Sequence, residues 1–507
     1  MRSLATLLLF LSLFSARSAR AQAPTYNFTP LTQLLQDSLA RLGGRAGLLL
    51  IQNGQVIYKQ YFGGWNDNTT IPIASGSKLP SMAAVLTLVD EGRLNLDDVV
   101  TKYLPQSFAA KPAITLRQLM SHTSGLPGGS RFLETNTLTL AQAVDSIGRR
   151  APMSRYAPGT AFQYGGVSMH VAGRLAEIAA GESWDALFAR RIAGPLNMPN
   201  TDYLGLGPTT NFRIAGGAQT RMPEYAHLLQ MLLDDGLYNG QRVLSPAAVR
   251  AMLSDQTAGV PLVGTPYQND PRRQNFRYGF GAWLERLNPD NGLPTEFGDQ
   301  GAFGFSPWLD KCRNLAGVFF VQRTLRSVQP TYTRVRQLVS SIVAVQLPAV
   351  SISQAGSVLS SSVATGNQWY LSGTALAGAT GAQYQPTQPG SYTVRVTYAG
   401  NCTTTSAPVA VTALATGAAP VAGGWLAFPN PAADQLTVQV PPALASAGLV
   451  HAQAYSAEGR RVAELPVLGR RAEQWAFSVA PLAAGLYTLR LSVAGQPPAF
   501  VRLAVQH

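Results

Sequence analysis

The sequence predicts an α+β domain over residues 22–346, followed by two small all-β units. Strand patterns at Ala46–Ile51 and Val56–Phe62 are joined through Asn53-Gly54, a dipeptide that favours β-hairpins. Strand patterns return between Tyr278 and Gln322, after a largely helical middle. Because strands at both ends enclose helices, we expect distant segments to share one sheet. After Leu347-Pro348, Ser, Thr, Gly and Ala dominate and the helical periodicity stops, which indicates β structure.

The middle of this domain shows apolar residues at helical spacing. The run Met82–Val89 is apolar on every side, which predicts a buried central helix. We expect the helices to lie at Pro30–Leu42, Met82 to Glu91-Gly92, Asp97–Leu104, Thr115–Ser121, Val167–Ala180, Tyr225–Asp235, from Leu244–Val249 onward, and Tyr332–Val345.

The remainder of the chain alternates apolar and polar residues in short runs. Gln368–Leu371 and Ser391–Tyr398 are typical of half-buried strands, so residues 347–412 are expected to form a small β-sandwich. Residues 413–424 are rich in Gly and Ala and indicate a linker. Residues 425–507 form a second β unit, with strands expected at Leu436–Val440, Val450–Tyr455 and Leu486–Ser492.

The net charge of +13 is carried almost wholly by arginine. The arginines are scattered in short pairs such as Arg149-Arg150 and Arg470-Arg471, and no basic stripe alternates with aromatic residues. This pattern favours a generally basic surface and argues against nucleic-acid binding. With 507 residues, the chain is too long for a single core.

The histidines and cysteines do not predict a metal site or another cofactor. Neither of the two cysteines, Cys312 and Cys402, belongs to a cluster with ligand spacing. Because these cysteines fall in different regions, we expect two unpaired thiols. The histidines, none paired at ligand spacing, are His122, His170, His227, His451 and His507.

The N-terminus has the pattern of a signal peptide over residues 1–21. Arg2 supplies the positive start, Leu4–Phe14 the apolar core, and Ala19-Arg20-Ala21 the cleavage site. The apolar core is too short to span a bilayer, and no later segment is long and apolar enough. We therefore expect the mature chain to leave the cytoplasm without a transmembrane segment.

Ser75-Gly-Ser-Lys78 is the candidate nucleophile segment. In a helix, three residues are about one turn, so both side chains leave the same face. Lys78 can act as the base that activates Ser75 if burial removes its proton. The pattern alone is weak, but Lys78 is the only lysine that has a serine three residues earlier. Gly76 and Pro80 disfavour a regular helix start, so we expect tertiary packing to hold Ser75.

Two further side chains have both a catalytic and a structural interpretation. His122 lies in Ser121–Pro127, where Gly and Pro after a helix usually mark a loop held by side-chain hydrogen bonds, so we favour a structural role. Tyr164 follows Pro158-Gly159. Taken alone, it is best interpreted as a core tyrosine with a bonded hydroxyl.

Three segments together resemble the serine β-lactamase and penicillin-binding-protein superfamily, in its class C-like branch. The family signature is Ser-x-x-Lys, then Tyr-x-Asn, then a Lys- or His-led motif that ends in Gly. Here these fall at Ser75–Lys78, Tyr164–Gly166 and Asp299–Gly301, and Ile114–Pro127 is also similar to the family. The resemblance covers about residues 30–345. It implies an antiparallel sheet flanked by helices, together with an all-helical subdomain.

The resemblance assigns roles position by position. Ser75 would be the acylated nucleophile, and Lys78 and Tyr164 would share the proton transfers, with the lysine charge lowering the pKa of the phenol. The backbone N–H groups of Ser75 and Ala302 would form the oxyanion hole, beside Gly301. No cofactor is implied.

Two positions depart from the family pattern. Gly166 stands in place of Asn, so no side-chain amide there can orient the lysine or hold a substrate amide. Asp299 stands in place of Lys or His, and an anion there would repel a substrate carboxylate. Penicillins and peptidoglycan stem peptides carry that carboxylate. The departures therefore predict a neutral ester, or an amide that lacks this group, as substrate.

The tail resembles the type A C-terminal sorting domain of the type IX secretion system of Bacteroidetes. Phe428–Ala432, Ala457–Gly459 and Leu482–Tyr487 carry this resemblance, which covers Trp425–His507. It implies that the type IX machinery is a partner and that the protein is secreted or on the outer cell surface. The middle unit, with Trp369, is similar to bacterial Ig-like modules.

These inferences predict a secreted or surface serine hydrolase that cleaves ester or amide bonds through an acyl-enzyme on Ser75. A D,D-peptidase or β-lactamase acting on peptidoglycan-like substrates is an alternative. A non-catalytic surface binding protein with a degenerate hydrolase domain is another. Gly166 and Asp299 favour the binding protein, whereas the intact set of Ser75, Lys78 and Tyr164 favours the enzyme.

Overall fold

The computed structural model describes residues 25–257, 259–267, 270–412, 425–441, 449–457, 459–471 and 473–506. The expected signal peptide and the expected linker therefore lie outside the described residues. The chain divides into two compact units, Met1–Gln346 and Leu347–His507. Across the described ranges, no helix is both long enough and apolar enough to cross a membrane.

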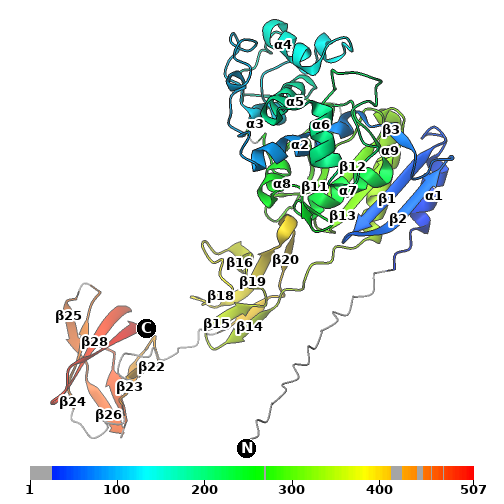
Figure 1. Cartoon of the computed structure of the whole chain (residues 1–507). Helices are drawn as coiled ribbons and strands as arrows, with labels where there is room; N and C mark the ends of the chain where they lie inside the picture. Colours follow the sequence, from blue (N-terminus) through cyan, green and yellow to red (C-terminus); the bar gives the residue numbers. More distant parts are fainter. Residues whose placement is uncertain are drawn as a thin grey trace, which may run out of the picture. The chain divides into compact units, whose positions relative to one another are not determined.

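The first unit is built on a seven-stranded antiparallel sheet (Figure 1). In sheet order its strands are β2 (Gln55–Phe62), β1 (Ala46–Gln52), β13 (Leu315–Phe320), β12 (Ser306–Asp310), β11 (Pro294–Gly298), β10 (Trp283–Leu287) and β9 (Arg277–Tyr278). Gly47 of β1 lies opposite Phe320 of β13. The predicted pairing of distant segments in one sheet is thus confirmed, and Asn53-Gly54 forms the hairpin turn with both residues at positive φ.

Helices cover both faces of this sheet. Their bounds are α1 (Thr29–Ser38), α2 (Lys78–Asp90), α3 (Leu116–Met120), α4 (Leu140–Arg150), α5 (Val167–Ala180), α6 (Trp184–Phe188), α7 (Met222–Leu233), α8 (Pro246–Met252) and α9 (Leu325–Ile342). Strand β1 is buried along its whole length, as expected for a strand covered on both sides.

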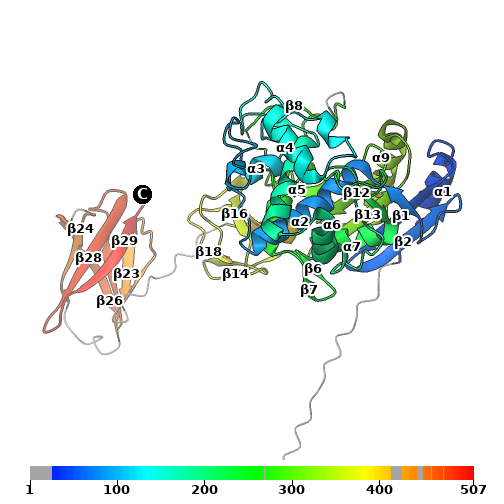
Figure 2. The ribbon, with the colours of Figure 1, turned by 45° about the horizontal axis from the view of Figure 1, so that its top comes forward.

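Alternate residues of β1 belong to two different cores. Leu48 and Leu50 pack with α1 and α9, which lie side by side on one face (Figures 1 and 2). Leu49 and Ile51 pack in the larger core on the other face, together with α2 and α7. Every residue of α2 from Lys78 to Leu88 is buried, so the predicted central helix is confirmed.

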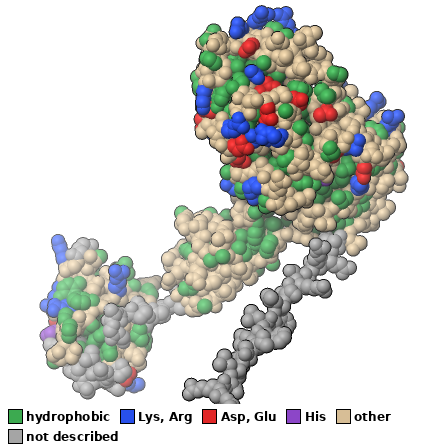
Figure 3. Space-filling model, in the orientation of Figure 1, with side chains coloured by type: hydrophobic (Ala, Val, Ile, Leu, Met, Phe, Trp, Pro, Cys, Tyr) green, Lys and Arg blue, Asp and Glu red, His purple; other side chains and the backbone are tan. Residues whose placement is uncertain are grey.

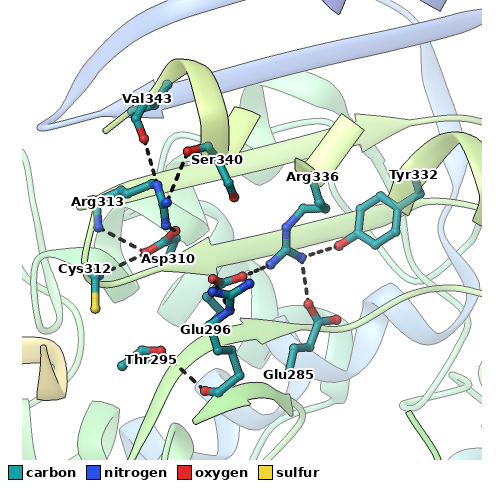
Figure 4. A network of polar contacts seen from close by, with 11 residues as sticks. Glu285, Thr295, Glu296, Asp310, Cys312, Arg313, Tyr332, Arg336, Ser340 and Val343 are labelled. Carbon is teal, nitrogen blue, oxygen red and sulfur yellow. Dashed lines mark hydrogen bonds and ion pairs between the residues drawn. The ribbon is translucent and has the colours of Figure 1, made fainter. Parts of the chain in front are cut away.

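A buried ionic network ties α9 to the sheet (Figure 4). The guanidinium of Arg336 donates to Glu285 at 2.7 Å and to Glu296, and it also donates to the hydroxyl of Tyr332 at 2.8 Å. It lies over the ring of Trp308, 5.1 Å from the ring centroid. A buried arginine is tolerated only when its donors are satisfied, as they are here by two carboxylates.

Several predicted elements differ from those observed. Asp97–Leu104 contains only the short 3₁₀ turn Val100–Lys102, so the predicted helix there is wrong. Helix α9 begins at Leu325, seven residues before the predicted Tyr332. Pro330 lies in its second turn, where it removes a single intrahelical hydrogen bond and does not end the helix. The expectation of unpaired thiols is also wrong, since Cys312 and Cys402 are both disulfide-bonded. Distance in the sequence does not exclude a disulfide in an exported chain.

The second unit consists of small antiparallel β-sheets, as predicted. Around Trp369 and Tyr392 lie one sheet of β14 (Ile352–Ala355), β15 (Val358–Ser361) and β18 (Gln383–Tyr384), and another of β17 (Thr374–Ala375), β16 (Asn367–Leu371), β19 (Gly390–Thr397), β20 (Thr403–Thr405) and β21 (Val409–Val411). Around Trp475 and Phe477 lie β22 (Leu426–Phe428), β23 (Gln435–Gln439), β27 (Gln474–Ser478) and β26 (Val467–Arg471), and then β25 (Arg461–Glu464), β24 (Leu449–Tyr455), β28 (Gly485–Val493) and β29 (Ala499–Val505).

The charged side chains are dispersed over the surface. On the face shown in Figure 3, arginines and lysines occur in small groups, several of them beside acidic side chains. Exposed cations of the described residues form ion pairs with acidic side chains, such as Arg190 with Glu182 and Lys102 with Asp98. Interleaved charges of both signs differ from the continuous basic footprint that nucleic acids require.

The turn that carries Ser75 is sensitive to added volume at Gly76. A Cβ at this position would lie 2.6 Å from the ring of Phe305, which is fully buried. We expect Gly76→Ala to lower the free energy of unfolding by about 1–3 kcal/mol, because a close-packed ring has no room to move. Thermal unfolding of the full chain should show a lower midpoint. Gly129→Ala is the control, because a Cβ there meets nothing within 4 Å, and an equal effect of both changes would contradict this explanation.

Candidate active site

Ser75 lies in a 3₁₀ turn, Ala74–Ser77, between β3 (Thr70–Pro72) and α2. Ala74 has a φ of +46°, a left-handed conformation that is unfavourable for a residue with a Cβ. Ser75 keeps partial solvent exposure, whereas Gly76, Ser77 and Lys78 are buried. The serine is therefore the accessible residue of an otherwise enclosed segment.

Contacts from distant segments hold this turn. The Ser77 hydroxyl donates to the Ala74 carbonyl at 2.6 Å and accepts the Ala218 N–H at 2.9 Å. The Tyr225 hydroxyl donates to the Gly76 carbonyl at 2.7 Å. The sequence suggested that Pro80 would disfavour a helix start here, but the structure shows no such conflict. Helix α2 begins at Lys78, and N–H groups in a first turn lack intrahelical partners.

Lys78 and Ser75 are in direct contact. Lys78 Nζ lies 2.8 Å from Ser75 Oγ and donates to the Ala215 carbonyl at 2.8 Å. The lysine is only 3% exposed. Burial lowers the pKa of Lys78 to about 8, although the charge of Asp299 acts in the opposite direction. The amine is therefore still mostly protonated at neutral pH, and its neutral form becomes the main one as the pH rises above this pKa.

Tyr164 completes the predicted trio. Lys78 Nζ lies 4.6 Å from its ring centroid, and Tyr164 lines the same pocket as Ser75. The expected lowering of the phenol pKa is wrong. Burial, and next the charge of Asp299, raise the pKa of Tyr164 well above its ordinary value, and the Ser75 hydrogen bond offsets only part of this. The phenol therefore keeps its proton.

His122 belongs to the aromatic cluster behind Tyr164. Its ring lies 4.8 Å from that of Tyr164 and 5.1 Å from that of Tyr278, between centroids. Within the described part of the chain, neither ring nitrogen has a hydrogen-bond partner. Burial and the Lys78 charge hold the pKa of His122 well below its ordinary value. The imidazole is thus a neutral packing group. The loop around it is held by side-chain hydrogen bonds, as expected from the sequence, among them that of the Ser121 hydroxyl to the Arg117 carbonyl at 2.8 Å.

Asp299 is buried beside the start of α2. Its side chain is fully buried, and Oδ2 accepts the Leu79 N–H at 3.2 Å, at the start of α2. A carboxylate in this position caps the helix. Burial raises the pKa of Asp299 well above its ordinary value, against the opposing effect of Lys78. The carboxylate does not line the pocket itself, but its charge reaches the site, because it acts on the pKa of both Lys78 and Tyr164.

Gly301 brings the last predicted segment against the nucleophile turn. A Cβ on Gly301 would lie 2.1 Å from the Ile73 carbonyl oxygen, so the approach requires glycine. The next residue, Ala302, is exposed. Among the described residues, the N–H groups of Ala302 and Ser75 donate to no protein acceptor. Both can therefore donate to a substrate oxygen that binds beside the serine.

A pocket of about 310 Å³ opens beside Ser75. Lys78, Tyr164 and Gly166 line it, so the structure brings the first two predicted motifs together. Gly166 precedes α5, and the Leu133 side chain approaches it so closely that a Cβ there would lie 3.0 Å from Leu133. Across the described ranges, no cluster of acidic, His or Cys side chains is placed to hold a metal ion.

Sequence reasoning missed part of this lining. Leu133, Leu206 and Arg213 come from loops of the helical region and contribute to the same pocket. No sequence motif predicts that these residues line the pocket, because their positions depend on the tertiary packing of the loops. The available signal was the pair Gly216-Gly217, which indicates a turn ahead of the predicted helix Tyr225–Asp235.

Comparisons with known proteins identify two segments. Residues 31–340 match the family described as Beta-lactamase, and residues 426–500 match the Secretion system C-terminal sorting domain. A solved structure, the putative β-lactamase from Bacteroides dorei DSM 17855, is 28% identical with a TM-score of 0.57, covering 63% of this chain and 99% of that chain. EstCE1, "a hydrolase with promiscuous acyltransferase activity", shares the fold at 20% identity and a TM-score of 0.51, covering 61% of this chain and 97% of that chain.

Curated relatives match shorter segments. Protein flp of Staphylococcus aureus is 27% identical over 179 residues, which are 31% of this chain and 34% of that protein. The chain thus spans about a third of the length of this relative. Penicillin-binding protein 4 of Amycolatopsis lactamdurans is 31% identical over 223 residues, covering 36% of this chain and 56% of that protein.

The two family matches agree with the site and with the tail. The sorting domain indicates type IX secretion to the outer cell surface. The Beta-lactamase match spans the sheet, the helical region and the Ser75–Lys78 contact. The chain belongs to the β-lactamase and penicillin-binding-protein superfamily of serine hydrolases.

Proposed function

We propose that the protein is a secreted or surface serine hydrolase that cleaves ester or amide bonds through an acyl-enzyme on Ser75. One observation carries this proposal: the buried Lys78 amine lies 2.8 Å from Ser75 Oγ. A serine becomes nucleophilic when an adjacent base can accept its proton, and a lysine becomes a base when burial lowers its pKa.

Lys78 is the general base in this mechanism. Its neutral amine accepts the Ser75 proton while Oγ attacks the substrate carbonyl carbon, which gives a tetrahedral intermediate. The Ala215 carbonyl accepts a hydrogen bond from Nζ at 2.8 Å and fixes its direction. This backbone carbonyl does the orienting work for which Gly166 has no side chain.

Tyr164 transfers the second proton. Its hydroxyl keeps its proton because its pKa is raised, and its ring lies beside Lys78 in the pocket that Ser75 also lines. It donates to the leaving oxygen or nitrogen as the bond to the acyl carbon breaks, and the ammonium of Lys78 returns a proton to the phenol. Water then attacks the acyl-enzyme with the same groups acting in reverse, which releases the acid and restores Ser75.

The oxyanion hole is assigned to two backbone N–H groups. Those of Ser75 and Ala302 donate to no acceptor within the described part of the protein. Donors that are already in place stabilise the charge that develops on the carbonyl oxygen without reorganisation. The close contact between Gly301 and Ile73 fixes the Ala302 segment against the nucleophile turn.

The alternatives receive less support. The binding-protein alternative rests on Gly166 and Asp299. However, Ala215 supplies the missing partner of Lys78, and Asp299 caps α2 instead of facing the pocket. A D,D-peptidase or β-lactamase activity rests on the likeness to Penicillin-binding protein 4, which covers 36% of this chain.

An activated serine should react with a fluorophosphonate. We expect intact-mass spectrometry of the mature full chain to show one adduct on the wild type and none on Ser75→Ala, since Ser75 is the serine of the described residues that contacts a buried lysine amine. Ser340→Ala is a matched control that should still be labelled, because Ser340 lies on α9, outside the pocket lining. Absence of an adduct on the wild type at high reagent excess would instead support the binding-protein alternative.

The pH dependence of hydrolysis should follow the protonation state of Lys78. We expect kcat/KM for a neutral ester to rise with pH through a midpoint near the Lys78 pKa of about 8, because only the neutral amine accepts the serine proton. The charge of Asp299 raises the pKa of Lys78. In Asp299→Asn that pKa falls, and the rise in kcat/KM should move to lower pH.

A matched variant separates this local effect from a general change of charge. Asp37→Asn removes an exposed carboxylate on α1 and should leave the midpoint unchanged. A midpoint that stays in place or moves upward in Asp299→Asn would show that the aspartate does not act on the base.

A further inference from the structure

Arg213 is a cation of the pocket that has no acidic partner. It lines the same cavity as Ser75 and Lys78. Among the described residues it forms no ion pair, and its side chain makes one hydrogen bond, from Nη2 to the backbone carbonyl of Glu134 at 3.3 Å. A guanidinium has five N–H donors, so most of them remain available.

The backbone of Arg213 is fixed relative to the catalytic lysine. Its carbonyl accepts the N–H groups of Gly216 at 2.9 Å and Gly217 at 2.7 Å, which closes a tight turn. The same turn presents the Ala215 carbonyl to Lys78 Nζ at 2.8 Å. The turn that orients the base therefore also fixes where the arginine side chain begins.

The other basic side chains that line the pocket, Lys78 and His170, are less available to a substrate anion than Arg213 is. Lys78 is buried and engaged by Ser75 and Ala215. Burial, only partly offset by the hydrogen bond that the His170 ring donates to Asn211 Oδ1, lowers the pKa of His170 to about 4, and the Arg213 charge adds to this lowering. The imidazole is thus neutral at ordinary pH.

The negative groups are placed differently. Glu134 lines the pocket at an exposed position, where water screens its charge. Asp299, the residue expected to repel an anionic substrate, is fully buried beneath α2 and is absent from the pocket lining.

We propose that Arg213 is a specificity-determining residue that binds a carboxylate of the substrate, so that the substrates are esters or amides bearing a negative charge near the scissile bond. Arginine suits this role because its planar donors match a carboxylate in a bidentate manner. The proposal rests on the proposed hydrolase function. It differs from the expectation of neutral substrates, which rested on the negative charge of Asp299.

A matched pair of esters tests this assignment. The 4-nitrophenyl monoester of succinate carries a carboxylate where 4-nitrophenyl butyrate carries an alkyl end. We expect the wild-type chain to have a higher kcat/KM for the succinate ester. In Arg213→Gln the ratio of the two kcat/KM values should fall about 10- to 100-fold, mainly through KM, because hydrogen bonds to charged groups are among the stronger ones.

Three further variants test whether the preference for the succinate ester depends on charge. Arg213→Lys keeps the charge and should retain most of the preference. Glu134→Gln removes a negative charge from the rim and should shift the ratio further toward the succinate ester. Arg155→Gln, which changes an exposed arginine outside the pocket lining, should leave the ratio unchanged.

The opposite outcomes overturn the assignment. Equal losses for both esters in Arg213→Gln would mean that Arg213 only shapes its loop, and a wild-type preference for butyrate would mean that the site rejects anions. Fluorophosphonate labelling separates these failures from failure of the hydrolase proposal. Labelling of Ser75 without an anion preference removes the assignment of Arg213 alone, whereas an unlabelled wild type that hydrolyses neither ester removes both.

Discussion

The contact between the buried amine of Lys78 and the hydroxyl of Ser75 is the constraint on which the rest of the hydrolase domain depends. A charged lysine without a full set of partners is costly in an apolar interior, so burial favours its neutral form. The fold supplies that burial by enclosing α2, which is buried from Lys78 to Leu88. The sheet covers one side of this helix and the helical region covers the other. At the same time, the 3₁₀ turn before α2 leaves Ser75 itself accessible to a substrate.

The two departures from the family pattern change the surroundings of this contact but leave the contact intact. Where Gly166 provides no amide, the carbonyl of Ala215 holds Lys78. Where Asp299 replaces a cation, its carboxylate caps α2 from below. Asp299 thereby acts on the pKa of Lys78 from a buried position outside the pocket lining. The positive charge in the pocket comes from Arg213, on the turn that also carries Ala215. One short loop thus links orientation of the base with recognition of the substrate.

Much of the fold follows from local patterns in the sequence. The Asn53-Gly54 hairpin, the all-round apolar run of α2 and the change of composition after Leu347 predict the sheet, the central helix and the β units. The Ser75–Lys78 contact follows from one turn of spacing. The pKa of Tyr164 does not, because desolvation depends on neighbours from distant segments. Nor does the direction of Asp299, since the end of a strand does not fix which side its next residue faces. Arg213 lies on a loop whose position depends on tertiary packing.

Direct titration of Lys78 tests the central claim. The chain has only five lysines, Lys59, Lys78, Lys102, Lys111 and Lys311, so lysine labelled with ¹³C at the ε carbon gives a simple NMR spectrum, and Lys78→Met identifies the resonance of interest. We predict that the resonance missing from this variant titrates with a midpoint near the Lys78 pKa of about 8. A midpoint at or above ~10.4, the value of an unperturbed lysine, would mean that Lys78 stays charged beside Ser75 and would contradict its role as the base.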